Sequence, residues 1–209
     1  SIQKALGDYL EKQRQQFARF YFVGDEDLLE LIGSSKDPAK VQKHFSKMFA
    51  GISALVIEEV ERGAETQVIV TGMVSHAGLE TVPFNNPINV TENPKINVWL
   101  TMLEVEMRNA LANAAEQSLT GLRAMAEKGM FADQKDDFLQ WLSEFPSQCG
   151  LLMCQVQWTE ATEKALVGCE SGDTSELSKV GENIEATLSC LAGQVLVEKS
   201  LLQRKKAEA

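Results

Sequence analysis

The feature that most constrains the fold of this chain is a long stripe of apolar residues that begins near residue 96. Its members step by four and three residues: Ile96, Leu100, Leu103, Met107, Ala110 and Ala114, widened by Trp99 and Leu111. This spacing places them on one face of an α-helix. Asn93-Pro94 is typical of an N-cap and a first-turn proline, and either Gly121 or Gly129 could end the helix. Glu104 and Arg108 are oriented for an ion pair on this helix.

Helical spacing recurs in six other segments. They are residues 1–17, 25–33, 38–52, 133–145, 151–168 and 174–206. Pro38 suits a first helical position and Pro146 a break, residues 151–168 are apolar enough to be buried, and 174–206 is expected to be one continuous helix. The helical pattern already runs at residue 1 and is not stopped after Lys206. We therefore expect both ends to continue into a longer chain.

Three runs rich in Val and Ile interrupt the helical pattern between residues 54 and 91. Turn residues at Arg62-Gly63 and Ala77-Gly78 separate them, which is typical of antiparallel strands. Pro83 and Pro87 mark an edge, because proline cannot donate to a central ladder. The predicted fold class is mainly α, an elongated helical bundle with a small antiparallel β insertion. Its parts are helices at 1–53, a hairpin or small sheet at 54–91, and long helices at 92–209.

The stretch FARFYFVGDEDLLELIG, residues 17–33, concentrates four aromatic residues just before an acidic patch. It could be an exposed binding patch or a buried strand that runs into a capped helix. Helix-capping preferences favour the second reading, with Asp25 as N-cap and Asp25–Asp27 in the first turn. We therefore expect Phe20 and Phe22 to be mostly buried. Exposure of all four aromatics on one face would instead indicate a docking surface.

Composition narrows the classes of partner. The formal net charge is −10, which argues against nucleic acid and anionic membranes, since both attract basic surfaces. No apolar run reaches the roughly 20 residues of a membrane span. The four cysteines form no CxxC pair and have no nearby histidine, so neither zinc nor disulfides are expected and a reducing, intracellular compartment is favoured.

Sequence motifs typical of nucleotide-binding or catalytic sites are scarce in this chain. No glycine is followed by lysine and no GxGxxG occurs, which excludes a phosphate-binding loop of the P-loop type within this segment. His44 lies on a predicted helix, where a structural role is favoured over a catalytic one, and His76 lies at a predicted turn. The acidic residues fit solvated helix faces and caps rather than an acid–base pair. No catalytic, cofactor-binding or metal-binding residue is predicted.

The tryptophans and the last helix leave alternatives open. Trp99, Trp141 and Trp158 could floor a ligand groove, but apolar neighbours three or four residues away favour core packing. The final helix could form a dimeric coiled coil. Packing within a bundle is favoured, because Gly181 and Glu198 interrupt its apolar seam.

Three blocks of residues, in order along the chain, resemble the linker region of cytoplasmic dynein heavy chains. They span most of residues 15–170 and correspond to an aromatic run before an acidic helix start, a helix with a Trp-Leu pair, and a Pro- and Trp-containing helix. The matching residues are Arg19-Phe20-Tyr21-Phe22, Asp27-Leu28-Leu29, Val41-Gln42, His44, Lys47, Phe49, then Trp99-Leu100, Glu104, Glu106-Met107-Arg108, then Pro146, Gln148, Gln155, Trp158-Thr159, Glu163 and Ala165-Leu166.

The resemblance implies a mechanical role. In dyneins the linker is a helical arch across a ring of AAA+ modules, it joins the ring to the cargo-binding tail, and its straightening is the power stroke. This chain would be about the C-terminal half of the linker, leading toward the first AAA+ module. ATP and magnesium would bind in the parent's downstream modules and not here. The implied partners are the AAA+ ring of the same heavy chain and other dynein subunits, without direct microtubule contact, in a cytoplasmic, cytoskeleton-associated setting.

Two other functions compete with this one. A helical adaptor would bind a partner helix through an exposed apolar groove. A small-molecule enzyme would use scattered carboxylates or His44, and would need a deep pocket holding several carboxylates around that histidine.

Overall fold

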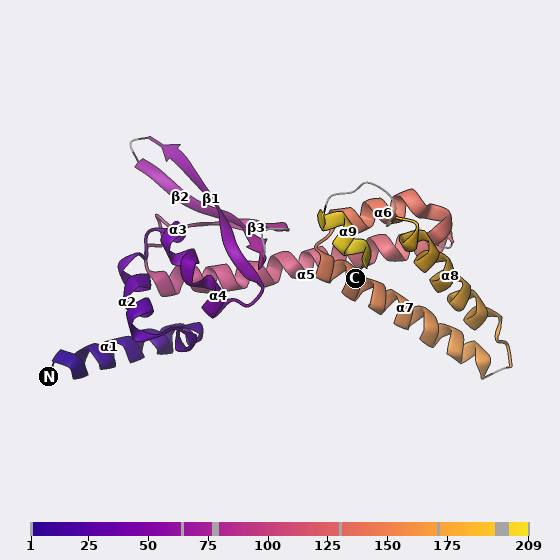
Figure 1. The fold of residues 1–209 in the computed structure, drawn as a ribbon, viewed down its shortest axis with the longest axis horizontal. Helices are drawn as coiled ribbons and strands as arrows, with labels where there is room; N and C mark the ends of the chain where they lie inside the picture. The colour runs from indigo at the N-terminus through magenta and orange to yellow at the C-terminus, as the bar shows by residue number, and fades with distance from the viewer. Residues whose placement is uncertain are drawn as a thin grey trace. The chain divides into compact units, whose positions relative to one another are not determined.

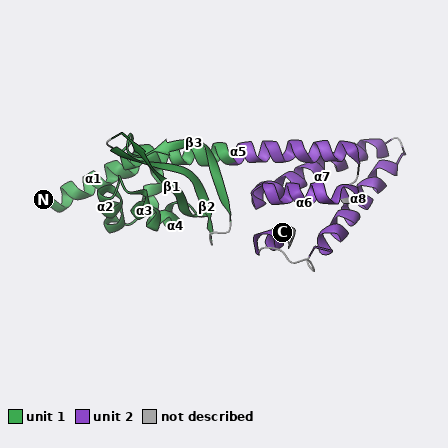
Figure 2. Ribbon diagram, turned by 90° about the horizontal axis from the view of Figure 1, so that it is seen from above, with its two compact units in different colours: residues 1–110 green, residues 111–209 purple. Residues whose placement is uncertain are grey.

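The computed structural model describes residues 2–63, 65–76, 80–129, 131–170, 172–194 and 201–208 (Figure 1). Within these ranges the chain is mainly helical with one three-stranded antiparallel sheet, so the predicted mainly α class with a small antiparallel β insertion is confirmed. The chain divides into two compact units, residues 1–110 and 111–209 (Figure 2). None of the described helices combines the length and the apolar composition that crossing a membrane requires.

The first unit joins short helices and the sheet to the first half of a long helix. Its elements are α1 (Ile2–Gln16), η1 (Ala18–Phe22), α2 (Asp25–Gly33), α3 (Pro38–Val41), η2 (Gln42–His44), α4 (Phe45–Met48), β1 (Ile52–Arg62), β2 (Glu65–Ser75), β3 (Thr81–Asn89) and the start of α5 (Ile96–Lys128). One hydrophobic core runs from Leu10 through Phe45 and Val70 to Trp99 and Leu103, so helices, sheet and α5 share it.

The predicted sheet and its edge are confirmed. The strand order is β1-β2-β3, all antiparallel, and β3 with Pro83 and Pro87 lies at an edge. Gly63, at φ +68°, follows β1 in the turn toward β2. The second predicted turn, Ala77-Gly78, lies outside the described residues. Gly72 in β2 is needed for close approach, because a Cβ there would lie 2.8 Å from the carbonyl oxygen of Val82.

The aromatic stretch is not the predicted strand, and only two of its four aromatics are exposed. Residues Ala18–Phe22 form a 3₁₀ helix, whose period of three residues brings every third side chain to the same side. Phe17, Phe20 and Val23 are therefore buried, and Phe17 and Phe20 meet edge to face at 5.0 Å. Phe22 is 71% exposed, so the prediction that it is buried is wrong, whereas the burial of Phe20 is confirmed.

The helix after this stretch begins almost where predicted. Asp25–Asp27 occupy the first turn of α2, as expected. The N-cap is Gly24 and not Asp25, because the Gly24 carbonyl accepts the first helical bond, from Leu28 at 2.9 Å. The next helix, α3, has Pro38 at its first position, as predicted, and Asp37 is its N-cap, with a carboxylate that accepts from the amide of Lys40 at 3.2 Å.

The single helix expected at residues 38–52 is instead three short helical segments, α3, η2 and α4. Phe49 adopts an extended conformation at φ −133°, which ends α4 and leads into β1. The apolar spacing is still satisfied, because Val41, Phe45 and Met48 all reach the core. The helical spacing of these apolar residues therefore reflects their packing into the core, and it does not require one unbroken helix.

The long helix α5 starts later than predicted. Asn93 does not cap it, because its amide and side chain both donate to the Asn89 carbonyl, at 3.2 and 3.1 Å. The Lys95 carbonyl is the first acceptor of the helix, and it accepts from the amides of Val98 and Trp99. The helix ends at Lys128 before Gly129, at φ +137°, so the later of the two proposed glycine stops is confirmed.

All described secondary-structure elements of the second unit are helices. Its elements are the end of α5, η4 (Phe131–Gln134), α6 (Lys135–Glu144), α7 (Ser147–Cys169), α8 (Ser175–Ala192) and α9 (Leu201–Glu208). Trp141 lies at the centre of its core, with its indole Nε1 donating to the Ser118 carbonyl at 2.9 Å. Gly121 permits this packing, since a Cβ there would lie 3.1 Å from the indole ring.

Two helical predictions for the second unit are wrong in part. Residues 174–206 do not form one helix, because α8 ends at Ala192, where the amides of Gly193 and Gln194 close the last turn. Residues 195–200 lie outside the described part of the chain. Helix α7 is not fully buried as expected, since Leu152 and Val167 are exposed.

Candidate functional site

The eleven residues singled out by the resemblance, here called the motif residues, fall into both units. They are Arg19, Phe20, Tyr21, Phe22, Asp27, His44, Trp99 and Arg108 in the first unit, and Pro146, Gln155 and Trp158 in the second.

Arg19 fastens three elements of the first unit together. Its guanidinium donates to the Met48 carbonyl at 2.9 Å, lies 4.8 Å above the ring of Phe49, and pairs with Glu104 of α5 at 3.5 Å. Glu104 also pairs with Arg108, so the predicted ion pair is confirmed. Planar guanidinium groups suit such combined stacking and carboxylate contacts. We call Arg19, Phe49, Glu104 and Arg108 the Arg19 brace.

A buried carboxylate forms a second tie between the sheet and α5. Glu106 accepts from the amide and side chain of Asn86, both at 3.2 Å, and from Asn109 at 3.2 Å. Buried carboxylates need such partners. In the sequence Glu106 stands out only as part of a motif, and nothing in its spacing indicates its partner on β3.

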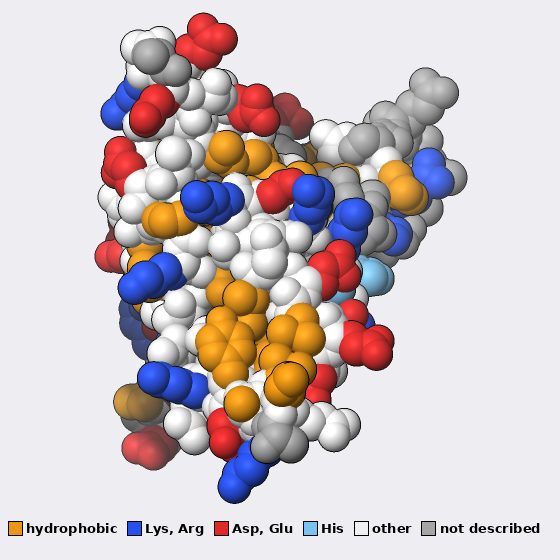
Figure 3. Space-filling view, turned by 90° about the vertical axis from the view of Figure 1, so that its left-hand side faces the viewer, with side chains coloured by type: hydrophobic (Ala, Val, Ile, Leu, Met, Phe, Trp, Pro, Cys, Tyr) orange, Lys and Arg blue, Asp and Glu red, His pale blue; other side chains and the backbone are white. Residues whose placement is uncertain are grey.

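Two motif aromatics face outward. Tyr21 donates its hydroxyl to Glu11 of α1 at 2.7 Å, and this hydrogen bond raises the pKa of Tyr21. Phe22 has the larger exposed fraction. Figure 3 views the end of the first unit at which α1 begins, where hydrophobic side chains gather between charged ones. Exposed large hydrophobic residues of α1 and η1 are Ile2, Leu6, Tyr9, Tyr21 and Phe22.

His44 is brought together with Asp27. Its Nδ1 lies 3.4 Å from an Asp27 oxygen, and its Nε2 lies 3.5 Å from Glu30. Lys47 donates to Asp27 at 2.6 Å, and this hydrogen bond lowers the pKa of the Asp27 carboxyl. His44 is buried but Glu30 is 56% exposed in its side chain. The cluster therefore lies at the surface and is not the deep carboxylate-lined pocket that an enzyme would need.

Trp99 and Pro146 hold structural positions. Trp99 is fully buried and its Nε1 donates to the Ser35 carbonyl at 2.9 Å, which supports the core reading. Pro146 is the N-cap of α7 and is separated from the end of α6 only by Phe145. The predicted break at this proline is confirmed.

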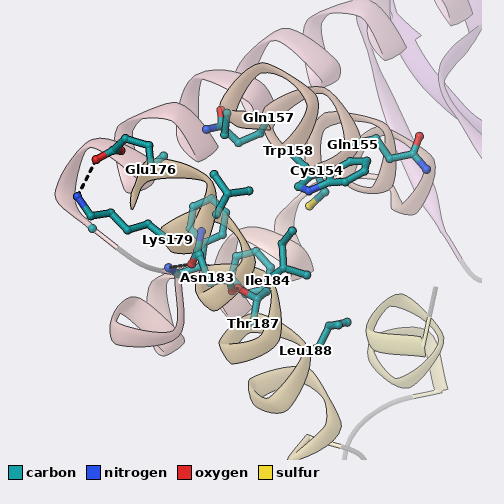
Figure 4. Close-up of a pocket in the computed structure, with 16 residues that line it drawn as sticks. Cys154, Gln155, Gln157, Trp158, Glu176, Lys179, Asn183, Ile184, Thr187 and Leu188 are labelled. Carbon is teal, nitrogen blue, oxygen red and sulfur yellow. Dashed lines mark hydrogen bonds and ion pairs between the residues drawn. The ribbon is translucent and has the colours of Figure 1, made fainter. Parts of the chain in front are cut away.

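Gln155 and Trp158 line an apolar groove of about 580 Å³ between α7, α8 and the end of α5 (Figure 4). Trp158 is 52% exposed, so its predicted core position is wrong. Phe131, Phe138, Ile184 and Leu188 are the largest aliphatic and phenyl side chains of the lining. Burial raises the pKa of the Cys154 thiol, which also lines the groove, to about 11.

The sequence leaves a groove floored by Trp158 as an alternative, but core packing is favoured over it. The signal was present in the apolar stripe of α8, at Val180, Ile184 and Leu188, which was assigned to helix packing. In the structure α8 has no fully buried residue among those described. An amphipathic stripe fixes which face is apolar, but it does not reveal whether a neighbouring helix covers that face.

Comparisons with known proteins identify the family. A family model described as "Dynein heavy chain, N-terminal region 2" matches residues 1–118. Cytoplasmic dynein heavy chains of Drosophila melanogaster and Dictyostelium discoideum are 43% and 42% identical over 99% of this chain. Cytoplasmic dynein 2 heavy chain 1 of Homo sapiens is 35% identical over 78% of it. The chain spans only about 4% of the length of the first two relatives and 3% of the human protein. The predicted resemblance to dynein heavy chains is thus confirmed, and the chain belongs to the dynein heavy chain family.

Proposed function

We propose that this chain is a mechanical segment of a microtubule motor, the C-terminal part of the linker of a dynein heavy chain. It would transmit nucleotide-driven movement of the AAA+ ring to the cargo-binding tail. Residues 1–53, 54–91 and 92–209 would be successive parts of this linker, the last leading toward the first AAA+ module. The names of the two most similar relatives given above support a cytoplasmic setting, associated with the cytoskeleton.

The observation that carries the proposal is the Arg19 brace. A lever has to move as one body, and Arg19 joins η1, the end of α4 and α5 at one point. Helix α5 has 33 residues, which at 1.5 Å per residue makes it about 50 Å long. The shared, close-packed core adds stiffness, because packed interiors are hardly compressible. These are properties that force transmission needs.

The partners follow from the same proposal. The AAA+ ring of the same heavy chain would contact this segment differently in its two states, since only differential contacts can shift a conformational equilibrium. ATP and magnesium would bind in the ring and other dynein subunits would join through the parent chain. The net charge of −10 is unfavourable for binding the acidic microtubule, nucleic acid or anionic membranes.

Substitution of Arg19 in a complete motor tests the proposal. Arg19→Gln should slow microtubule gliding while the ATPase rate is retained, because the ring would still hydrolyse ATP but would move a looser lever. Arg62→Gln, at the exposed end of β1, makes the same charge change and should leave both rates unaltered. A variant that hydrolyses ATP slowly but moves microtubules a normal distance for each ATP hydrolysed would contradict the lever role. The chain by itself should neither bind nor hydrolyse ATP.

The groove beside Trp158 favours a second candidate, a helical adaptor that holds a partner helix. Such grooves accept the apolar face of an amphipathic helix. Leu188→Asp in the complete motor distinguishes the two roles. Loss of a subunit from the purified complex with normal gliding would favour the adaptor, whereas an unchanged subunit composition would favour the lever alone.

A further inference from the structure

The environment of His44 is electrostatically incomplete. Asp27 and Glu30 are three residues apart on α2, so their carboxylates share one face of that helix. His44 of η2 lies between them, with Nδ1 near Asp27 and Nε2 near Glu30. A neutral imidazole carries one N–H and one lone pair, and ionised carboxylates only accept. One of the two nitrogen–oxygen approaches is therefore lone pair against lone pair unless a second ring proton or a metal ion lies between the two atoms.

The unsatisfied nitrogen is Nε2. His44 is 7% exposed, and among the described residues its Nε2 finds no hydrogen-bond partner. The 3.5 Å to Glu30 is longer than a good hydrogen bond of about 2.7–3.2 Å. Leaving a buried polar atom unpaired is costly. The two facts together point to a group between Nε2 and Glu30.

The separation matches a bridging metal ion. In a tetrahedral centre with bonds of about 2.1 Å to nitrogen and oxygen, neighbouring ligand atoms are about 3.4 Å apart. One ligand atom from each of Asp27, Glu30 and His44 lies within 4.8 Å of the other two. We propose that Glu30 and the Nε2 of His44 bind a divalent transition-metal ion, for which zinc is the model ion, with Asp27 orienting the imidazole.

The surroundings suit this arrangement. Metal-bound histidines commonly donate their other N–H to a carboxylate, and Asp27 stands at Nδ1 in that position. Lys47, 2.6 Å from the other oxygen of Asp27, keeps that carboxylate in place. Glu30 is exposed enough to rotate onto the ion, and solvent would complete the coordination. An imidazole ligand favours zinc over magnesium or calcium, which prefer oxygen.

Zinc titration of the 209-residue chain tests the site. Zinc, but not magnesium, should raise the melting temperature and shift the Nε2 resonance of His44, which is assigned by comparison with His76→Gln because the chain has only two histidines. Glu30→Gln should weaken zinc binding at His44 at least tenfold. Glu26→Gln, an equal charge change in the same helix, should leave it within about twofold. Asp27→Asn should weaken it by about 10–100-fold through loss of orientation.

The outcomes are decisive in both directions. A zinc-induced shift of the His44 resonance that is lost in Glu30→Gln and kept in Glu26→Gln supports the site. A His44 resonance that zinc leaves unchanged overturns it, even if the four cysteines bind zinc elsewhere. Equal zinc affinity at His44 in the two glutamine variants overturns it as well. The result is independent of the proposed lever role, since it needs no motor activity.

Discussion

The indole nitrogen of Trp99 donates a hydrogen bond of 2.9 Å to the backbone carbonyl of Ser35, 64 residues earlier in the chain. It ties α5 to the turn that follows α2. Trp99→Phe keeps most of the buried ring but leaves that carbonyl without its donor, so unfolding should become easier by about 1–3 kcal/mol. Urea denaturation measures the loss. Trp158→Phe, at a half-exposed position, should stay within about 0.5 kcal/mol, and equal losses at both sites would contradict the assigned burial.

Phe20 and Phe22 are two residues apart and should behave in opposite ways. Phe20 is completely buried, so Phe20→Ala should cost about 3–5 kcal/mol through lost burial and a cavity. Phe22→Ala removes a mostly exposed ring and should change the free energy of unfolding by less than about 0.5 kcal/mol. Thermal or urea unfolding measures both variants, and each serves as the control for the other. A large effect of Phe22→Ala would mean that its ring is covered in solution.

This contrast shows how far the sequence could predict the fold. Burial of Phe20, the first turn at Asp25–Asp27 and the edge strand with its prolines follow from capping, periodicity and proline chemistry. Phe22 was mispredicted because a strand was assumed, and a period of two would bury Phe20 and Phe22 together. A 3₁₀ segment has a period of three, and nothing local distinguishes the two in five residues.

Non-local packing explains the other differences. Asn93 has the right chemistry for an N-cap, but its bonds to Asn89 at the end of β3 hold it in a turn instead. Trp158 has apolar neighbours at helical spacing, yet no described helix covers it fully. The break after Ala192 was predictable, since Gly193 is a standard stop signal that the apolar stripe obscured. The contacts of His44 with α2 join residues 14 to 17 apart, which spacing alone could not reveal.

Gly72 offers a test of the sheet. A methyl group there would lie 2.8 Å from the Val82 carbonyl and 3.3 Å from the Cα of Pro83, both backbone atoms of β3. Gly72→Ala should therefore push the edge strand away and cost about 1–3 kcal/mol. Gly51→Ala, where no atom lies within 4 Å of the added carbon, is the matched control and should be nearly neutral. Unchanged stability in Gly72→Ala would show that β3 does not pack as described.

Cys154 should be a slow thiol. Its pKa of about 11, caused by burial in the groove wall, leaves only about one thiol in a thousand as the reactive thiolate at pH 8. Alkylation by iodoacetamide, followed residue by residue with mass spectrometry, should accelerate about tenfold per pH unit up to about pH 11. Urea should abolish the protection. Fast alkylation at pH 7 in the folded chain would contradict the burial.

Asp27 gives the stability a defined pH dependence. Its hydrogen bond from Lys47 lowers the pKa of Asp27 below the ordinary 3.8, so the folded state holds its proton less tightly than the unfolded state. The stabilisation is therefore present above pH 3.8 and is lost as the pH falls through the lower, folded-state pKa. Unfolding free energies of the native sequence and Asp27→Asn, measured from pH 7 to pH 2, should differ at neutral pH and converge in acid.

A double-mutant cycle assigns that difference to Lys47. Lys47→Gln should remove most of the pH-dependent part, and adding Asp27→Asn to it should change the stability less than Asp27→Asn does alone, because the main partner is already gone and only the contact with His44 remains. High salt should shrink the effect, since both side chains are partly exposed and their attraction is screened. A gap between native and Asp27→Asn proteins that persists at pH 2, or survives in the Lys47→Gln background, would mean that Asp27 acts through His44 or through its position in the first turn of α2, and not through Lys47.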